Sequence, residues 1–169
     1  MEFLGENVIV NQLRVKQKYI NELENNLLLY YTSTSRLSSA IIEEQQKNVT
    51  AKKEKSVEAL HKLKEQSIMM KEAILKGNLD KIGEILDFGW NFKKQMADGI
   101  SNPAIDELYN TALKAGATGG KISGAGGGGF MIFYCPANTR YKVMEALLPF
   151  GGEFKKYLFV DTGVTSWRI

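Results

Sequence analysis

The sequence is short of the side chains on which several kinds of site chemistry depend. Its 169 residues include one cysteine, Cys135, and one histidine, His61. An intrachain disulfide needs two thiols, and a zinc site of cysteine and histidine normally needs three or four such ligands, so both are excluded. His61 lies in a charged stretch with helical periodicity, and we expect a solvated helix residue there rather than the base of a serine triad.

Long hydrophobic runs and a large excess of one charge are missing too. No apolar run approaches the ~20 residues of a membrane span, and the first residues lack the basic segment and apolar core of a signal peptide. The 22 basic and 19 acidic residues leave a net charge of only +3. Trp90, Trp167 and the tyrosines show no basic interleaving, so they are expected to be core or half-buried packing. We therefore expect a soluble cytoplasmic protein with no nucleic acid or membrane as partner.

What remains is the composition of an ordinary globular protein, with 44% hydrophobic and 24% charged residues. The length predicts one domain over residues 1–169, and the apolar pattern predicts an α+β fold. Residues 7–15 look extended, whereas residues 16–25 fit either a helical turn or a loop. Strands are predicted at 27–31, 130–134, 154–160 and 164–169, with Asp161–Gly163 as the turn between the last two.

Spacings of three and four residues predict helices over most of residues 37–96. The first begins near Ser38, and Gly77 is placed to end the second, with Asn78 as the cap of the next, so that two long helices form a hairpin. Asn102 and Pro103 begin a further helix that should stop near Gly116, and residues 138–148 form the last. The buried stripe of the second helix is predicted to be Val57, Leu60, Leu63, Ser67, Met70 and Ile74.

Glycine is concentrated in one place. Eight of the 16 glycines fall between Gly116 and Gly129, and five of these lie in Gly124–Gly129. Ordering these five costs roughly 2.5 to 5 kcal/mol more than ordering alanines, a large part of the ~5 to 15 kcal/mol stability of a domain. The segment should therefore need positive φ angles, close approach of another chain segment, or N–H groups that converge on an anion. Phosphate is the natural anion, with Lys121 and Ser123 beside it.

Other interpretations of the glycines fit less well. A flexible linker would carry more serine, asparagine or charge, and would not run directly from a helix into an apolar strand. A Walker loop needs its lysine after the glycines, whereas Lys121 precedes them. The dinucleotide fingerprint needs the order strand, glycines, helix, and the order expected here is helix, glycines, strand.

Two segments resemble the GHMP kinase superfamily. Gly120–Gly129, with the sequence Gly-Lys-Ile-Ser-Gly-Ala-Gly-Gly-Gly-Gly, resembles its third signature motif, which lies between a helix and a strand of the C-terminal domain. Asn26–Arg36 resembles the strand and turn that open the C-terminal half of its sugar kinases. The resemblance covers essentially the whole chain but only half of such an enzyme. It implies a ferredoxin-like α+β fold with a mixed or antiparallel sheet and packed helices.

The resemblance also implies which functions belong to this chain. The ATP loop of the family, Pro-x-x-x-Gly-Leu-x-Ser-Ser-Ala, lies in an N-terminal lobe, and Ser35–Ala40 imitates only the tail of that loop. ATP and magnesium are therefore expected on an absent N-terminal lobe, with no catalytic residue or metal ligand here. Arg36 suits a two-point contact with phosphate, with a surface ion pair as the alternative. The implied substrate and phosphate-binding residues are Thr32, Thr34, Ser35, Arg36, Lys121, Ser123, Gly124, Ala125, Gly126, Gly127, Gly128 and Gly129.

The implied activity is that of an ATP-dependent sugar kinase. Within the superfamily the sequence most resembles kinases that phosphorylate D-glycero-D-manno-heptose 7-phosphate at the anomeric oxygen, on the way to GDP-heptose. The C-terminal lobe alone is expected to be inactive, and the apolar surface left without its partner lobe would favour a homo-oligomer. Two alternatives stay open, a non-catalytic anion-binding or interaction module and a galactokinase-like enzyme for another sugar.

Overall fold

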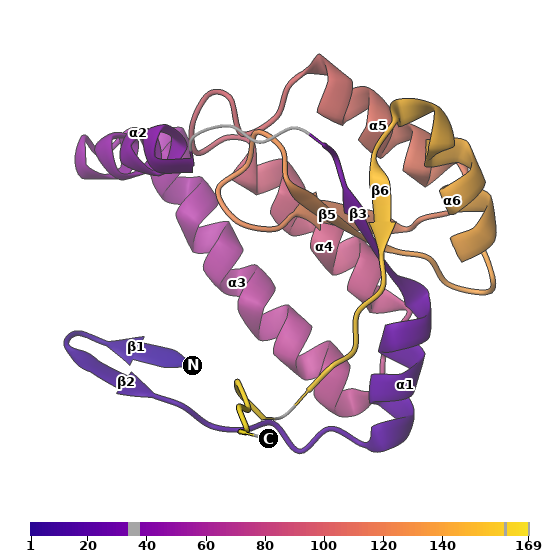
Figure 1. Ribbon diagram of the computed structural model, residues 1–169. Helices are drawn as coiled ribbons and strands as arrows, with labels where there is room; N and C mark the ends of the chain where they lie inside the picture. Colours follow the sequence, from indigo (N-terminus) through magenta and orange to yellow (C-terminus); the bar gives the residue numbers. More distant parts are fainter. Residues whose placement is uncertain (34–37, 161, 169) are drawn as a thin grey trace.

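A computed structural model describes residues 1–33, 38–160 and 162–168 of the chain. Its helices and strands form an α+β domain (Figure 1). In chain order the elements are β1 (Glu2–Leu4), β2 (Asn7–Ile9), α1 (Gln17–Asn26), β3 (Leu27–Tyr31), α2 (Ser38–Thr50), α3 (Glu54–Lys76), α4 (Lys81–Lys93), α5 (Pro103–Lys114), β4 (Gly119–Ile122), β5 (Phe130–Tyr134), α6 (Arg140–Leu147), the short 3₁₀ helix η1 (Leu148–Phe150) and β6 (Glu153–Lys155).

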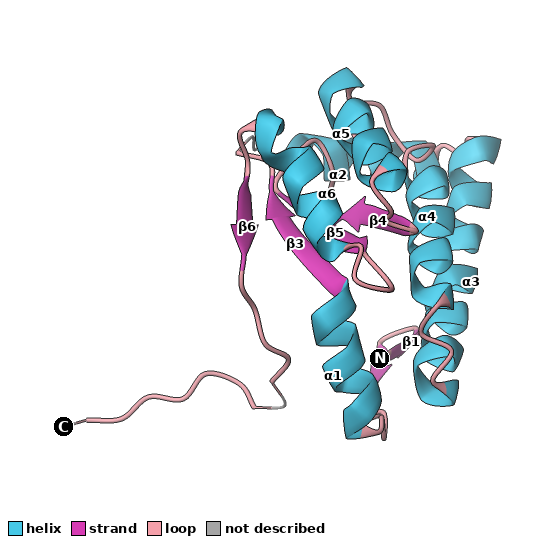
Figure 2. Ribbon diagram, turned by 90° about the vertical axis from the view of Figure 1, so that its right-hand side faces the viewer, coloured by secondary structure: helices cyan, strands magenta, loops and turns pink. Residues whose placement is uncertain are grey.

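The main sheet has the strand order β4-β5-β3-β6, and every neighbouring pair is antiparallel. Helices separate β3 from the β4–β5 pair, and α6 separates β5 from β6. This connectivity is the split arrangement of ferredoxin-like folds, so the predicted fold class is confirmed. Figure 2 shows β6 at one edge of the sheet and β4, next to α4, at the other. No helix in the described part of the chain has the length and apolar character that crossing a membrane requires.

Alternation along the strands divides the apolar side chains between two clusters. Tyr30 and Phe133 are fully buried on one face, in the main core with residues of α4, α5 and α6. Leu27 and Tyr134, on the opposite face, pack with residues of α1, α3 and α4 in a second cluster. The segment that fitted either a helix or a loop is thus the helix α1, because its Leu23 completes this second cluster.

The predicted hairpin of two long helices is formed by α3 and α4. Gly77 ends α3 with a φ of 74°, in the left-handed region that glycine adopts without strain. The prediction that Asn78 caps α4 is wrong, because α4 begins two residues later, after Asp80, and no side chain caps it. His61 is an exposed residue of α3, as expected.

The buried face of α3 agrees only in part with the predicted stripe, of which Leu63, Met70 and Ile74 are half-buried against the two clusters. Ser56, Ala59 and Ala73 are buried, whereas Leu60 is 43% exposed and Ser67 is exposed. The prediction followed the large apolar residues, but the fully buried residues of α3 are small, and α4 packs closely against this helix. A Cβ atom on Gly89 of α4, for example, would lie 2.1 Å from the side-chain amide of Gln66 on α3.

The C-terminal segment has less structure than predicted. The strand expected at 154–160 is confined to Glu153–Lys155, and residues 164–168 form no strand. Asp161 and Ile169 lie outside the described residues, so the expected turn is described only in part. Trp167 is 78% exposed, which contradicts the expected packing. The apolar pattern is that of a strand, but β6 is already the edge of the sheet and no partner beyond it is described.

The start of α5 follows the prediction. Asn102 is its N-cap, Pro103 is the first helical residue, and the Asn102 side chain accepts a hydrogen bond from the Ile105 N–H at 3.0 Å. We expect Asn102→Ala to lower the free energy of unfolding by ~1 kcal/mol, because that N–H then loses its partner. Urea denaturation measures the change, with Asn102→Asp as the control that keeps the cap. Equal midpoints for the alanine variant and the parent chain would contradict this role.

Candidate functional site

The glycine-rich segment contains a strand that the sequence did not predict. Gly119–Ile122 is β4, so the segment after α5 runs as strand, loop and strand rather than as one run of glycines. The loop from Ser123 to Gly129, here called the glycine loop, joins β4 to β5. The Ser123 N–H donates to the Phe130 carbonyl at 2.7 Å and closes the loop.

Glycines before the loop serve close packing between α4 and β4. A Cβ atom on Gly119 would lie 1.9 Å from the carbonyl oxygen of Gly83 in α4, and one on Gly83 would lie 1.9 Å from Oγ1 of Thr118. Tyr109 of α5 ties the same elements together, since its hydroxyl donates to Asp87 at 2.6 Å and accepts from the Gly120 N–H at 3.3 Å. These glycines fix the position of the strand that leads into the loop.

The glycine loop itself adopts a backbone that other residues rarely reach. All five of its glycines have positive φ, at 95° for Gly124, 120° for Gly126, 76° for Gly127, 138° for Gly128 and 89° for Gly129. Gly126 also needs its missing side chain, because a Cβ atom there would lie 2.8 Å from the Cα of Ile100. The expected needs for positive φ and close approach of another segment are both confirmed.

Four other segments hold the loop in place. Thr32, after β3, donates its N–H to the Gly129 carbonyl at 2.9 Å, and its hydroxyl accepts from the Gly129 N–H at 3.0 Å. The carbonyl of Ile100, between α4 and α5, accepts from the Gly127 N–H at 2.8 Å. Gln45 of α2 donates to the Ala125 carbonyl at 3.3 Å, and Figure 1 shows the loop beside this helix. Lys93, the last residue of α4, donates to the carbonyl of Gly124.

These contacts leave main-chain donors unused. Within residues 1–33, 38–160 and 162–168, the N–H groups of Gly124, Ala125, Gly126 and Gly128 have no hydrogen-bond acceptor. The loop carbonyls, by contrast, are partly taken by Lys93, Gln45 and Thr32. Successive N–H groups in a backbone of this kind can form a concave binding site for an anion.

Two lysines add positive charge beside the loop. Burial lowers the pKa of Lys121, which lies in β4 opposite Ile132. The pKa of Lys93 is lowered first by burial and then by the charge of Lys121. Neither ammonium has a carboxylate within 4 Å among the residues that the structure describes. The loop and its lysines therefore form a partly desolvated, electropositive site.

The structure brings together part of the predicted site. Ser123 and Gly124–Gly129 form the glycine loop, Thr32 is hydrogen-bonded to it, and Lys121 lies in β4 two residues before it, whereas Thr34, Ser35 and Arg36 lie outside the described residues. Sequence reasoning missed Lys93, Gln45 and Ile100. Lys93 carried no signal, because it is one lysine of a charged helix some thirty positions before the loop.

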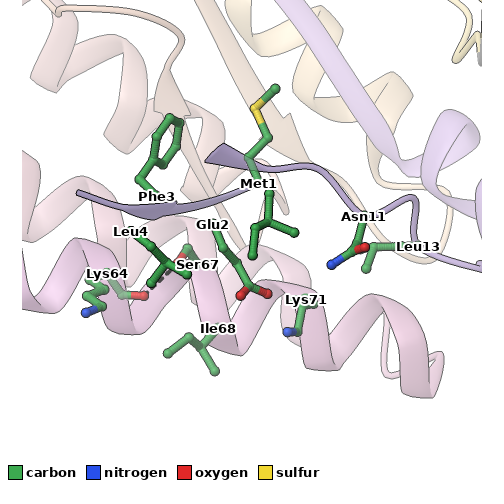
Figure 3. Close-up of a pocket in the computed structure, with 11 residues that line it drawn as sticks. Met1, Glu2, Phe3, Leu4, Asn11, Leu13, Lys64, Ser67, Ile68 and Lys71 are labelled. Carbon is green, nitrogen blue, oxygen red and sulfur yellow. Dashed lines mark hydrogen bonds between the residues drawn. The ribbon is translucent and has the colours of Figure 1, made fainter. Parts of the chain in front are cut away.

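Two other features of the structure are separate from this site. A cavity of about 890 Å³ lies between the β1–β2 hairpin and α3, lined largely by apolar side chains such as Phe3, Leu4 and Ile68 (Figure 3), and none of the predicted site residues that the structure describes lines it. Cys135 is fully buried, and burial raises the pKa of its thiol to about 12, so it is a core side chain rather than a nucleophile.

The fold and the loop define a class of protein. Residues 70–151 match the family described as GHMP kinases C terminal, a match that ends after the glycine loop, β5 and α6. Over these residues the chain therefore matches a GHMP kinase C-terminal domain.

Individual relatives show which kinases of this family the chain is similar to. The chain is 38% identical over 170 residues to the D-glycero-alpha-D-manno-heptose 7-phosphate kinase of Campylobacter jejuni, a match over 100% of this chain and 50% of that protein. A solved D-glycero-D-manno-heptose 1-phosphate kinase from Bacteroides thetaiotaomicron is 32% identical, with a TM-score of 0.65 over 97% of this chain and 42% of that one. The mevalonate kinase of Methanothermobacter thermautotrophicus is 33% identical over 82 residues, 43% of this chain and 26% of that protein. The chain thus spans about half the length of the heptose kinases that it matches.

Proposed function

We propose that this chain is the substrate-side lobe of an ATP-dependent kinase that phosphorylates D-glycero-D-manno-heptose 7-phosphate at the anomeric oxygen, a step toward GDP-heptose. The observation that carries the proposal is the glycine loop, with its fixed positive-φ backbone and unused N–H groups. All of this chain aligns, at 38% identity, with half of a heptose 7-phosphate kinase. The identity of the sugar is inferred from the relatives, and phosphate binding is inferred from the loop.

Phosphoryl transfer depends on positioning and on neutralising the charge of the transferred group more than on covalent chemistry. The free N–H groups of the glycine loop and the Lys121 ammonium fit phosphate oxygens. Ser123 adds a hydroxyl, and Thr32 orients the end of the loop. Thr34, Ser35 and Arg36, which follow Thr32 in the sequence, are proposed to contact the phosphate that the sugar already carries.

ATP and magnesium fit this chain only in part. The loop suits the oxygens of a phosphate group, but no cluster of three or more His, Cys, Asp or Glu side chains in the described residues could hold a metal ion. ATP supplies the phosphoryl group and magnesium neutralises its charge when they are bound. We therefore assign both mainly to a separate N-terminal lobe that this chain packs against, in the half of the heptose kinases that it does not match.

A fusion tests this division of labour. The N-terminal half of the Campylobacter jejuni enzyme, joined to this chain in place of its own C-terminal half, should convert heptose 7-phosphate and ATP to a bisphosphate. The 169-residue chain alone should show no turnover. Phosphorus NMR follows the reaction and identifies the new phosphate as anomeric. Turnover by the chain alone, or a folded but inactive fusion beside an active parent enzyme, would contradict the proposal.

The same assay separates the alternative substrates. Relatives that match this chain include mevalonate kinases as well as heptose kinases, so the fold admits different acceptors. Heptose 7-phosphate should react faster with the fusion than galactose or free heptose does. Calorimetry of heptose 7-phosphate with the chain alone tests the other alternative, a non-catalytic binding module. Such a module would bind the sugar phosphate tightly, whereas half of an enzyme would bind it weakly.

A further inference from the structure

Lys93 reaches the glycine loop because α4 and β4 run side by side in the same direction. Gly83 of α4 lies against Gly119, where β4 begins, and Lys93, at the end of α4, lies against Gly124, just beyond β4. Ten helical residues rise ~15 Å and five strand residues extend ~17 Å, so the two elements cover nearly equal lengths. The close packing at the start of β4 thus delivers the Lys93 ammonium to the loop.

The Lys93 and Lys121 ammonium groups lie close enough for the charge of Lys121 to act on Lys93, and neither has a carboxylate within 4 Å in the described residues. Burial lowers the pKa of both, and the charge of Lys121 lowers the pKa of Lys93 further. In the described parts of the chain, the Gly124 carbonyl, which accepts from Lys93, is the only hydrogen-bond acceptor of either ammonium. Each ammonium has three N–H donors, so most of their donors are available. A multiply charged anion would relieve the repulsion and use them.

The ligand that suits this pair is a phosphoryl group. It carries close to two negative charges at neutral pH and offers three strong acceptor oxygens. The unused N–H groups belong to the same glycine loop whose Gly124 carbonyl accepts from Lys93, and they supply directional donors. A sulfate has a similar shape, whereas chloride has a single charge and no fixed acceptor geometry, and a carboxylate has a single charge and only two oxygens.

We infer that Lys93 is a second phosphate-binding residue, which acts with Lys121 as a two-cation clamp on a phosphoryl group held against the glycine loop. The inference rests on the proposed function, because that function supplies the phosphoryl group. It adds a residue from α4 that neither the glycine motif nor the sequence analysis identifies. Lys94, the next residue, is a matched control, since it lies over the Trp90 ring and 3.9 Å from Asp106 instead.

The test is a titration of the 169-residue chain with inorganic phosphate, followed by NMR of the lysine side chains and the glycine amides. Phosphate should shift Lys93, Lys121 and the glycine loop together and raise the pKa of both lysines. Lys93→Met and Lys121→Met should each weaken binding about tenfold, and Lys94→Met should leave it unchanged. Lys121→Met should also raise the pKa of Lys93 in the phosphate-free chain, because the charge of Lys121 is one of the causes that lower it.

Three outcomes would overturn the inference. They are no saturable shift of either lysine, equal affinity of the Lys93→Met and Lys94→Met variants, and equal effects of chloride and phosphate at the same ionic strength. The fusion enzyme distinguishes a failure of the two-lysine clamp from a failure of the proposed kinase function. An active fusion in which Lys93→Met alters neither phosphate binding nor turnover would refute the clamp alone. An inactive fusion whose phosphate binding depends on Lys93 would refute the kinase alone.

Discussion

Gly126→Ala is expected to lower the free energy of unfolding by ~2–4 kcal/mol and to displace the glycine loop. Gly126 has a φ of 120°, and a Cβ atom there would lie 2.8 Å from the Cα and 2.9 Å from the carbonyl oxygen of Ile100. Ile100 is fully buried, so its backbone cannot move aside without disturbing the core. The free-energy costs of the strained backbone and of the steric clash add. The hydrogen bond from the Gly127 N–H to the Ile100 carbonyl should also be lost.

Gly124→Ala is the matched control for this substitution. Gly124 also has a positive φ, 95°, but no atom of the described residues lies within 4 Å of the Cβ position. It should therefore cost only the backbone strain, ~1–2 kcal/mol. Urea denaturation measures both variants, and the phosphate titration should show weaker binding for Gly126→Ala. Equal destabilisation by the two alanines would mean that Ile100 yields, and that close approach is not the reason for glycine at position 126.

The sequence predicted elements best where local chemistry and burial agree. The strands at 27–31 and 130–134 and the capped start of α5 match the structure, because continuous apolar residues and an Asn-Pro cap act locally. Prediction failed where the structure of a segment depends on the neighbouring elements it packs against. The apolar pattern at 164–168 forms no strand beside the sheet, and Leu60 of α3 is 43% exposed although it belongs to the predicted apolar stripe.

The candidate site divides in the same way. The need for glycine at 124–129 follows from the cost of ordering glycines, and the structure shows the positive φ angles that account for it. The involvement of Lys93, Gln45 and Ile100 could not be predicted, since each meets the loop only through tertiary packing. Tertiary packing likewise makes Gly119 part of a strand that contacts α4, although its sequence context is that of a glycine loop.

Trp90→Ala is expected to lower the free energy of unfolding by ~3–5 kcal/mol, or the melting temperature by roughly 6 to 20 °C. The Trp90 ring is fully buried in the main core, with its centroid 6.2 Å from that of Tyr109, which stacks in turn near Phe133 of β5. Its removal would leave a cavity between α4, α5 and the sheet. That is the framework which carries Lys93 and β4 to the glycine loop, so phosphate binding should weaken together with stability.

Two further substitutions make the Trp90 result specific. Trp167→Ala should change the free energy of unfolding by less than ~0.5 kcal/mol, because Trp167 is 78% exposed. Trp90→Phe should fall between the two alanine variants, since the Trp90 indole N–H has no hydrogen-bond partner in the described structure and only packing is lost. Calorimetric melting compares the three variants. Similar melting temperatures for Trp90→Ala and Trp167→Ala would contradict the prediction. They would mean that Trp90 does not stabilise the core that holds α4 against β4.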